Sequence, residues 1–194
     1  MSSEISVRYN SDISFWRMGA FVQASKRYLD DRLGISAGLR SDLNTFTEDG
    51  MNPISTLSPR ISASYVLADK WTLNASIGSY SKIPTYTILS FRDNSGVLMN
   101  KNVDYTRSIH YVLGTEYLPN TTTRFTLEAF YKQYRNVPVS VKDGISLANM
   151  GGDFGVIGNE DVITNGKGKS YGFELFAQQK LTKRFFGTLS YTFF

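Results

Sequence analysis

The sequence predicts an all-β fold: an antiparallel, up-and-down meander of about eight strands that forms part of a transmembrane β-barrel. Three observations carry this prediction. Tight turns alternate with long polar loops, the segments between them alternate apolar with polar residues, and aromatic residues gather at the expected strand ends. Transmembrane barrels have short periplasmic turns and longer extracellular loops, and the spacing of this chain has the same asymmetry.

The turn and loop signals divide the chain into four hairpins. Tight reversals fall at residues 29–32, 68–70, 119–121 and 182–183, and long connections fall at about 47–57, 82–104 and 137–168. We therefore expect the four reversals at the periplasmic end of the sheet and the three long loops at its extracellular end.

The segment from Thr123 to Arg135 shows the clearest alternation of apolar and polar residues. Leu127 and Tyr131 share one parity, while Glu128 and Lys132 occupy the other. Successive side chains of a strand point to opposite faces, so one face is apolar and the other is charged. The same pattern recurs at 33–42, 60–67, 71–77, 108–116, 171–180 and 185–193, less regularly from Phe15 to Arg27, and residues 3–9 could add a further strand end.

Aromatic residues lie near both ends of the expected strands. Because Tyr and Trp bury a ring while keeping a polar atom in water, such residues favour a lipid interface, although strands are rich in aromatics in any case. Beside the short turns these residues are Tyr28, Tyr65, Trp71, Tyr117, Phe185 and Phe186, and beside the long loops they are Phe46, Tyr80, Tyr105 and Tyr134.

Composition excludes several other classes of protein. No stretch approaches the roughly 18 apolar residues that a membrane-spanning helix needs. The 21 basic and 17 acidic residues are interspersed, without the basic run of a nucleic-acid binder, so no nucleic-acid partner is expected. The first residues lack the basic and apolar regions of a signal peptide, as expected for a mature secreted chain or an internal fragment.

The sequence offers little catalytic or metal-binding chemistry. With no cysteine and a single histidine, His110, a thiolate or multi-histidine metal site cannot form, and a Ser-His-Asp triad could be built in only one way. Asp153, Glu160 and Asp161 lie in a glycine-rich loop that could suit calcium, but their spacing does not match an EF-hand. We expect no enzymatic activity, no catalytic residue, no cofactor and no metal.

Six segments spread over nearly the whole chain share their order and spacing with a known barrel. They are Gly19–Gln23, Pro59–Tyr65, Trp71–Pro84, Leu127–Lys132, Ser170–Glu174 and Gly187–Thr192. Together they resemble the C-terminal barrel of TonB-dependent outer-membrane receptors, particularly those of Bacteroidetes.

The resemblance implies that residues 1–194 are a partial barrel domain in the outer membrane of a Gram-negative bacterium. In that family a barrel of about 22 strands encloses a plug, and a box near the start of the plug contacts TonB, which supplies energy. The plug and the remaining strands are absent from this sequence. The implied function is import of a nutrient ligand (siderophore, haem, vitamin or glycan). The implied partners are TonB, which acts through the missing plug, and the membrane lipid around the barrel. In the glycan-importing branch of the family a surface lipoprotein is a further partner.

The same resemblance places ligand contacts in the extracellular loops. Polar side chains there can hydrogen-bond a ligand and aromatic ones can stack on a flat or sugar-like one, although loop aromatics also pack against neighbouring loops. The candidates are Tyr86, Phe91, Arg92, Asp93, Asn94, Lys101, Lys142, Asp143 and Phe154.

Two other interpretations of the strand pattern stay open. The chain could be a complete small barrel of eight strands with a structural or adhesion role, in which the first strand pairs with the last and side chains fill the interior. The terminal Phe194 fits that alternative, because complete outer-membrane barrels commonly end on an aromatic residue. The chain could also be a soluble β-sandwich or a secreted β-solenoid, with the apolar face as its core.

Overall fold

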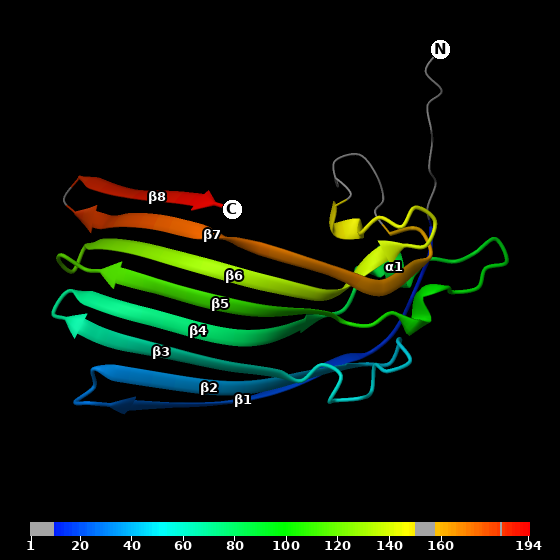
Figure 1. Cartoon of the computed structure of the whole chain (residues 1–194), viewed down its shortest axis with the longest axis horizontal. Coiled ribbons are helices and arrows are strands. Elements are labelled where there is room, and N and C mark those ends of the chain that lie inside the picture. Colours follow the sequence, from blue (N-terminus) through cyan, green and yellow to red (C-terminus); the bar gives the residue numbers. More distant parts are fainter. Residues whose placement is uncertain (1–9, 150–157, 183) are drawn as a thin grey trace, which may run out of the picture.

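A computed structural model describes residues 10–149, 158–182 and 184–194. These residues form one antiparallel sheet of eight strands, each hydrogen-bonded to the next in chain order (Figure 1). The predicted up-and-down meander is therefore confirmed. The strands are β1 (Arg17–Tyr28), β2 (Leu33–Asn44), β3 (Ser58–Ala68), β4 (Trp71–Lys82), β5 (Thr106–Tyr117), β6 (Thr123–Ser140), β7 (Val162–Thr182) and β8 (Phe185–Phe193), and the short helices are α1 (Tyr86–Leu89), η1 (Asn100–Asn102) and η2 (Leu147–Asn149).

The short turns lie at one end of the sheet and the long loops at the other, as the sequence predicts (Figure 1). In the first turn Leu29, Asp30 and Asp31 all have positive φ, between 52° and 65°, and Asp is one of the few residue types that tolerate this region. In the third turn Asn120 Oδ1 accepts the backbone N–H groups of Thr122 and Thr123, both at 2.9 Å.

We expect Asn120→Ala to lower the free energy of unfolding of the folded protein by about 1 kcal/mol, because two backbone donors lose their acceptor while remaining open to water. Urea titration measures the change. Thr121→Ala, at the neighbouring exposed position, is the control. A loss no larger than that of the control would contradict the role assigned to Asn120.

The third connection is shorter than the sequence predicts. Strand β6 continues to Ser140 and strand β7 begins at Val162. The connection between them is therefore residues 141–161, rather than 137–168. The paired strands pass an irregularity at Asn136, which has a φ of 55°, and the register shifts on both sides of Val137. The extension is stable because Val137 and Val162 are buried at the loop end, whereas the sequence there carries turn-forming residue types.

The first strand also begins later than predicted. It starts at Arg17 rather than Phe15, since Phe15 packs against Phe46 with ring centroids 5.3 Å apart. The strand end considered for residues 3–9 lies outside the described residues.

The sheet has two chemically distinct faces. Strand register aligns Ala75, Leu113, Ala129 and Phe173 in one row on the apolar face. Large side chains of this face are exposed, as Leu113 is at 55%. Within the described residues no second layer covers the sheet (Figure 1), unlike in a soluble sandwich. We therefore assign this outward face to lipid.

The hydrophobic core of the described residues lies in the loops, at one end of the sheet. It consists of Ile83, Ile88, Leu89, Val103, Tyr105, Leu147 and Val162, with Ile13, Phe15 and Phe46 packed against it. Among the described residues, none of the helices combines the length and apolar character that crossing a membrane requires. Strands β1 and β8 are not paired with each other, so the sheet is open, unlike a closed eight-stranded barrel.

Two aromatic rows bound the apolar face. At the short-turn end Tyr117 stacks on Trp71, with centroids 4.4 Å apart, and lies 6.4 Å from Phe125. At the loop end Tyr131 lies 6.2 Å from Tyr111 and 6.3 Å from Tyr171. The paired rows fit the girdles of a membrane barrel.

The loop-end girdle differs from the residues that the sequence indicates. Tyr105 is buried in the loop core and Phe46 packs against it. Tyr80 and Tyr134 instead flank His110 on the inner face. Tyr80 and Tyr134 share the parity of the polar residues in their strands, which places both rings on the inner face.

Candidate functional site

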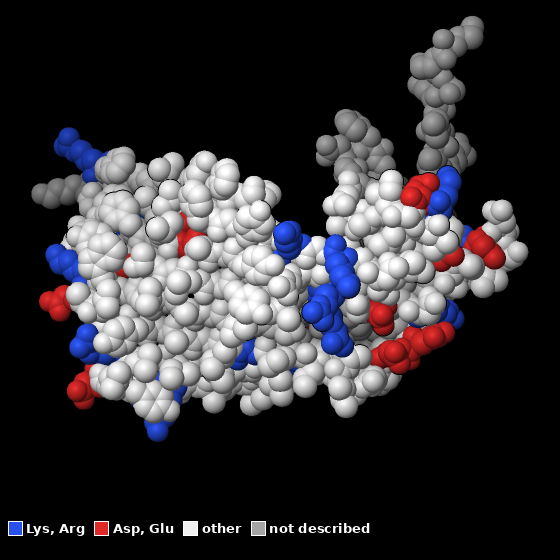
Figure 2. Space-filling model, in the orientation of Figure 1, with Lys and Arg blue, Asp and Glu red and all other residues white. Residues whose placement is uncertain are grey.

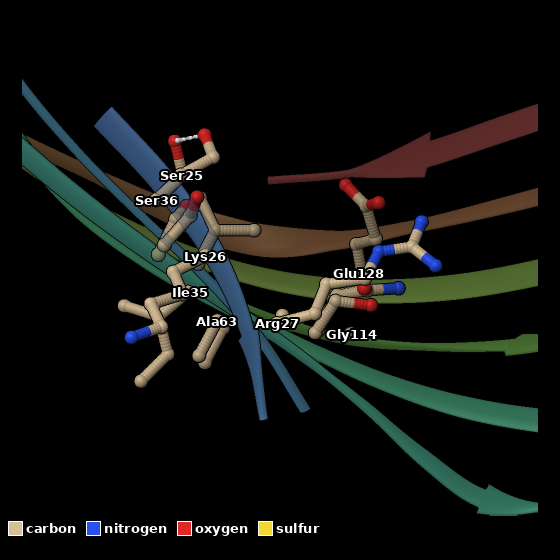
Figure 3. Close-up of a pocket in the computed structure, with 15 residues that line it drawn as sticks. Ser25, Lys26, Arg27, Ile35, Ser36, Ala63, Gly114 and Glu128 are labelled. Carbon is tan, nitrogen blue, oxygen red and sulfur yellow. Dashed lines mark hydrogen bonds between the residues drawn. The ribbon is translucent and has the colours of Figure 1, made fainter. Parts of the chain in front are cut away.

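The inner face of the sheet carries a polar hollow of about 700 Å³ that spans β1 to β6 (Figure 3). Its hydroxyls are partly satisfied by one another: the Oγ atoms of Ser25 and Ser36 are 2.8 Å apart. Polar side chains on this wall include Ser25, Arg27, Ser36, Ser64, Asn74 and Glu128. Such a wall suits water or a polar protein surface, and not lipid.

Two ion pairs of the described residues lie on the inner face. Arg40 donates two hydrogen bonds to the Asp42 carboxylate, at 2.6 and 2.7 Å, and Arg124 pairs with Glu116 at 2.5 Å. His110 lies 4.4 Å from the Tyr80 ring. The histidine thus contacts aromatic rings and has no triad geometry, and the described residues hold no cluster of His, Asp and Glu suited to a metal ion.

Above the sheet the long connections pack into one unit, here called the loop cap: residues 45–57, 83–105, 141–149 and 158–161. The first residue that joins two of these loops is Asn44, which is fully buried. The Asn44 amide donates to the Tyr105 hydroxyl at 3.0 Å, and its Oδ1 accepts the backbone N–H groups of Phe46 and Thr47 at 2.8 Å. This residue therefore joins the first loop to the second.

Asn100 is the second residue that joins loops of the cap. It is also fully buried, and its Nδ2 donates to the backbone oxygens of Ile88 at 2.8 Å and Glu160 at 2.9 Å. Its Oδ1 accepts the N–H of Val162 at 3.1 Å. One side chain thus joins the second and third loops. Sequence reasoning missed both asparagines, because Asn in a loop is usually a turn or surface residue.

The structure brings Arg92, Asp93 and Asn94 together in a small hairpin of the second loop. Arg92 Nη1 donates to the Gly96 oxygen at 2.7 Å. Asp93 Oδ1 accepts two backbone N–H groups at 2.9 Å. These two side chains therefore shape the hairpin, while Asn94 is exposed at its tip.

Tyr86 and Phe91 are already in contact with the protein or half-buried. Tyr86 meets Phe15 edge to face at 5.9 Å, and its hydroxyl accepts a long hydrogen bond of 3.4 Å from Arg17. The Tyr86 side chain is still 56% exposed, and Phe91 is half-buried. One ring face of Tyr86 can thus meet a ligand from outside.

The other candidates lie on separate segments of the loop cap. Lys101 is exposed in η1, and Lys142 and Asp143 are exposed in the turn after β6. The Asp143 N–H donates to Ser140 Oγ at 3.1 Å. Phe154 lies outside the described residues.

One sheet with an apolar face between aromatic rows, a polar inner face and a packed cap of long loops defines an outer-membrane β-barrel protein. The sequence model of the family "TonB dependent receptor-like, beta-barrel" matches residues 2–194, and the chain belongs to this family. The protein is accordingly located in the outer membrane of a Gram-negative bacterium.

Solved structures with a similar fold include receptors and a transporter. They include the siderophore receptor PirA from Pseudomonas aeruginosa (20% identity, TM-score 0.64), the alcaligin receptor FauA from Bordetella pertussis (18%, 0.60) and the copper transporter OprC (19%, 0.59). Each match covers 92% of this chain but only 32%, 29% and 28% of the other chain, respectively. The chain thus spans about a third of their length. No curated protein sequence matches it.

Proposed function

We propose that this chain is part of the barrel of a TonB-dependent transporter that imports a nutrient ligand by binding and passage, without catalysis. The observation that carries the proposal is the packed loop cap at the mouth of a polar inner wall. The similar structures named as a siderophore receptor, an alcaligin receptor and a copper transporter support a small nutrient ligand. Siderophore, haem, vitamin and glycan are the classes proposed.

The proposal treats residues 1–194 as one partial barrel domain of a longer receptor. Supporting observations are the unpaired edges of β1 and β8 and the coverage of about a third of PirA. TonB would act through a plug domain outside this sequence. The Bacteroidetes type, with a surface lipoprotein where the ligand is a glycan, is proposed from the six segments that carry the resemblance.

Ligand contacts are proposed for the exposed polar side chains of the loop cap. Asn94, Lys101, Lys142 and Asp143 are exposed and so can meet a ligand directly. Arg92 and Asp93 act mainly by holding the hairpin that presents Asn94. Tyr86, Phe91 and Phe154 are the proposed stacking residues.

The test uses the full receptor in its own bacterium. Uptake is measured with labelled ferric siderophores, haem, cobalamin and oligosaccharides, in the wild type, a receptor deletion and a TonB deletion. We expect both deletions to abolish uptake of one class. Unchanged uptake of every class in the receptor deletion would overturn the proposal.

The combined variant Asn94→Ala, Lys101→Ala, Lys142→Ala and Asp143→Ala then tests the loop contacts. We expect uptake to fall at least about tenfold at equal receptor abundance, because several polar contacts of about 1 kcal/mol each are lost. The matched control is Asp69→Ala, Lys70→Ala and Arg184→Ala at the short turns, which should transport normally.

A further inference from the structure

A basic patch lies on the outward face of the sheet, between the Tyr111–Tyr131–Tyr171 row and the loop cap. The register pairs Arg107 with Arg135, and Arg135 with Lys167, in one row across β5, β6 and β7. Lys169 follows two residues along β7 and therefore points to the same face. All four are exposed, and Figure 2 shows basic side chains in a band across the sheet where the strands approach the loops.

The patch continues the lipid-facing surface. Lys169 Nζ lies 5.9 Å from the centre of the Tyr171 ring, which belongs to the loop-end girdle. Arg135 follows Tyr131 by four residues in the same strand, about 13 Å further along it at roughly 3.3 Å per residue. Allowing for the usual tilt of barrel strands, the row of Arg107, Arg135 and Lys167 stands about 10 Å above the tyrosines, and Lys169 lies between the two rows. That is the level of lipid headgroups.

None of these four basic residues forms an ion pair with a described acid. Like charges opposite each other on neighbouring strands are destabilising, and three basic residues occupy this row. In the described part of the chain the two ion pairs are Arg40–Asp42 and Arg124–Glu116, both of the inner face. Arg107 lines a hollow together with Glu48, Asp49 and Asp104 but forms no ion pair with them. Asp104 accepts a hydrogen bond from Thr164, and Glu160 accepts one from Ser140. Arg107 is partly engaged by the Ser55 carbonyl.

The opposite rim of the sheet carries both signs of charge. Asp30, Asp31 and Arg32 lie in the first short turn, and Asp69 with Lys70 in the second, so Figure 2 shows basic and acidic atoms mixed at that end. The row of Arg107, Arg135 and Lys167 differs from that rim because it holds basic residues only. Such a row attracts an anionic group at the level of the outer leaflet.

We propose that Arg107, Arg135, Lys167 and Lys169 bind the phosphate groups of a phosphorylated glycolipid in the outer leaflet of the membrane. Three neighbouring strands span about 10 Å, so long basic side chains from all three can reach one diphosphorylated headgroup. Its acyl chains would lie on the apolar face below, next to Tyr131 and Tyr171. This inference rests on the membrane location of the barrel and is independent of the transported ligand.

The test uses the full receptor in detergent, with diphosphoryl lipid A, monophosphoryl lipid A and inorganic pyrophosphate as separate probes. The variant is Arg135→Gln, Lys167→Gln and Lys169→Gln, which spares Arg107 and its contact to the first loop. We expect it to bind diphosphoryl lipid A at least about tenfold more weakly, since each basic residue near an anionic lipid surface contributes substantially. The control, Lys26→Gln, Lys70→Gln and Arg184→Gln at the short-turn rim, removes the same charge and should bind as wild type.

The probes distinguish a lipid site from a general phosphate site. Diphosphoryl lipid A should bind more tightly than the monophosphoryl form, and pyrophosphate should bind weakly because it lacks acyl chains. Equal binding of pyrophosphate and lipid A would overturn the lipid assignment. Wild-type lipid binding by the triple variant, with a heat-stable folded barrel as the check on folding, would overturn the site itself.

Discussion

Replacement of Leu113 by arginine is expected to lower the free energy of unfolding of the membrane-inserted receptor by about 2–4 kcal/mol, the usual cost of a basic residue on the lipid face near the bilayer midplane. Leu113 is 55% exposed and stands in the row between the two aromatic girdles. A soluble sheet would tolerate arginine at a position so open to water. The size of the loss therefore measures the contact with lipid.

Val112→Arg is the matched control, because Val112 is the adjacent residue and lines the polar hollow of the inner face. Arginine there meets water and polar groups, so we expect a loss below about 1 kcal/mol. Both variants are compared by urea titration in lipid vesicles. Equal losses at the two positions would contradict the assignment of the faces, and so would a reversed order.

Replacement of Asn100 by alanine is expected to open the loop cap while leaving the sheet intact. Three backbone groups, those of Ile88, Glu160 and Val162, lose their partner. Each buried polar group left unpaired costs about 1–3 kcal/mol. The cap core is small, so we expect the loss to appear as local opening of the second and third loops.

Hydrogen exchange of the full receptor measures this opening segment by segment. Protection should fall in residues 83–105 and 158–162 by roughly 30-fold or more, the factor that about 2 kcal/mol represents, and should stay unchanged in β3 and β4. Asn94→Ala, at the exposed hairpin tip, should leave protection as in the wild type. A uniform loss of protection across the sheet would mean that Asn100 supports the barrel and not the cap.

The strands, their order and the two faces of the sheet could be predicted because they depend on local patterns. Leu127, Glu128 and their neighbours alternate with period two, and three of the four tight turns carry Asp or Asn. The third loop could not be bounded in this way. Asn136 and Gly166 are turn-forming residue types, yet pairing of Val137 and Val139 with β7 carries the strands past them.

The sequence could assign the candidate ligand contacts to loops, but it could not predict how these residues are arranged in three dimensions. Asp93 has the sequence character of a ligand-binding carboxylate, and the structure uses it to hold two backbone N–H groups. Asn44 and Asn100 carry the cap through contacts 61 and 62 residues away along the chain. Only the folded chain shows such contacts. The basic patch escaped prediction for the same reason, since Arg107, Arg135 and Lys167 become neighbours only through strand register.

Buried and exposed residues have different roles in the loop cap, and this difference affects how receptors of this kind diversify. Buried Asn44 and Asn100 hold the loops of the cap together, whereas exposed residues such as Asn94 and Lys142 do not contribute to this packing. Substitutions at the tips therefore change the surface offered to a ligand at little cost in folding. If these positions contact the ligand as proposed, new ligand preferences can evolve there while the barrel that carries them stays the same.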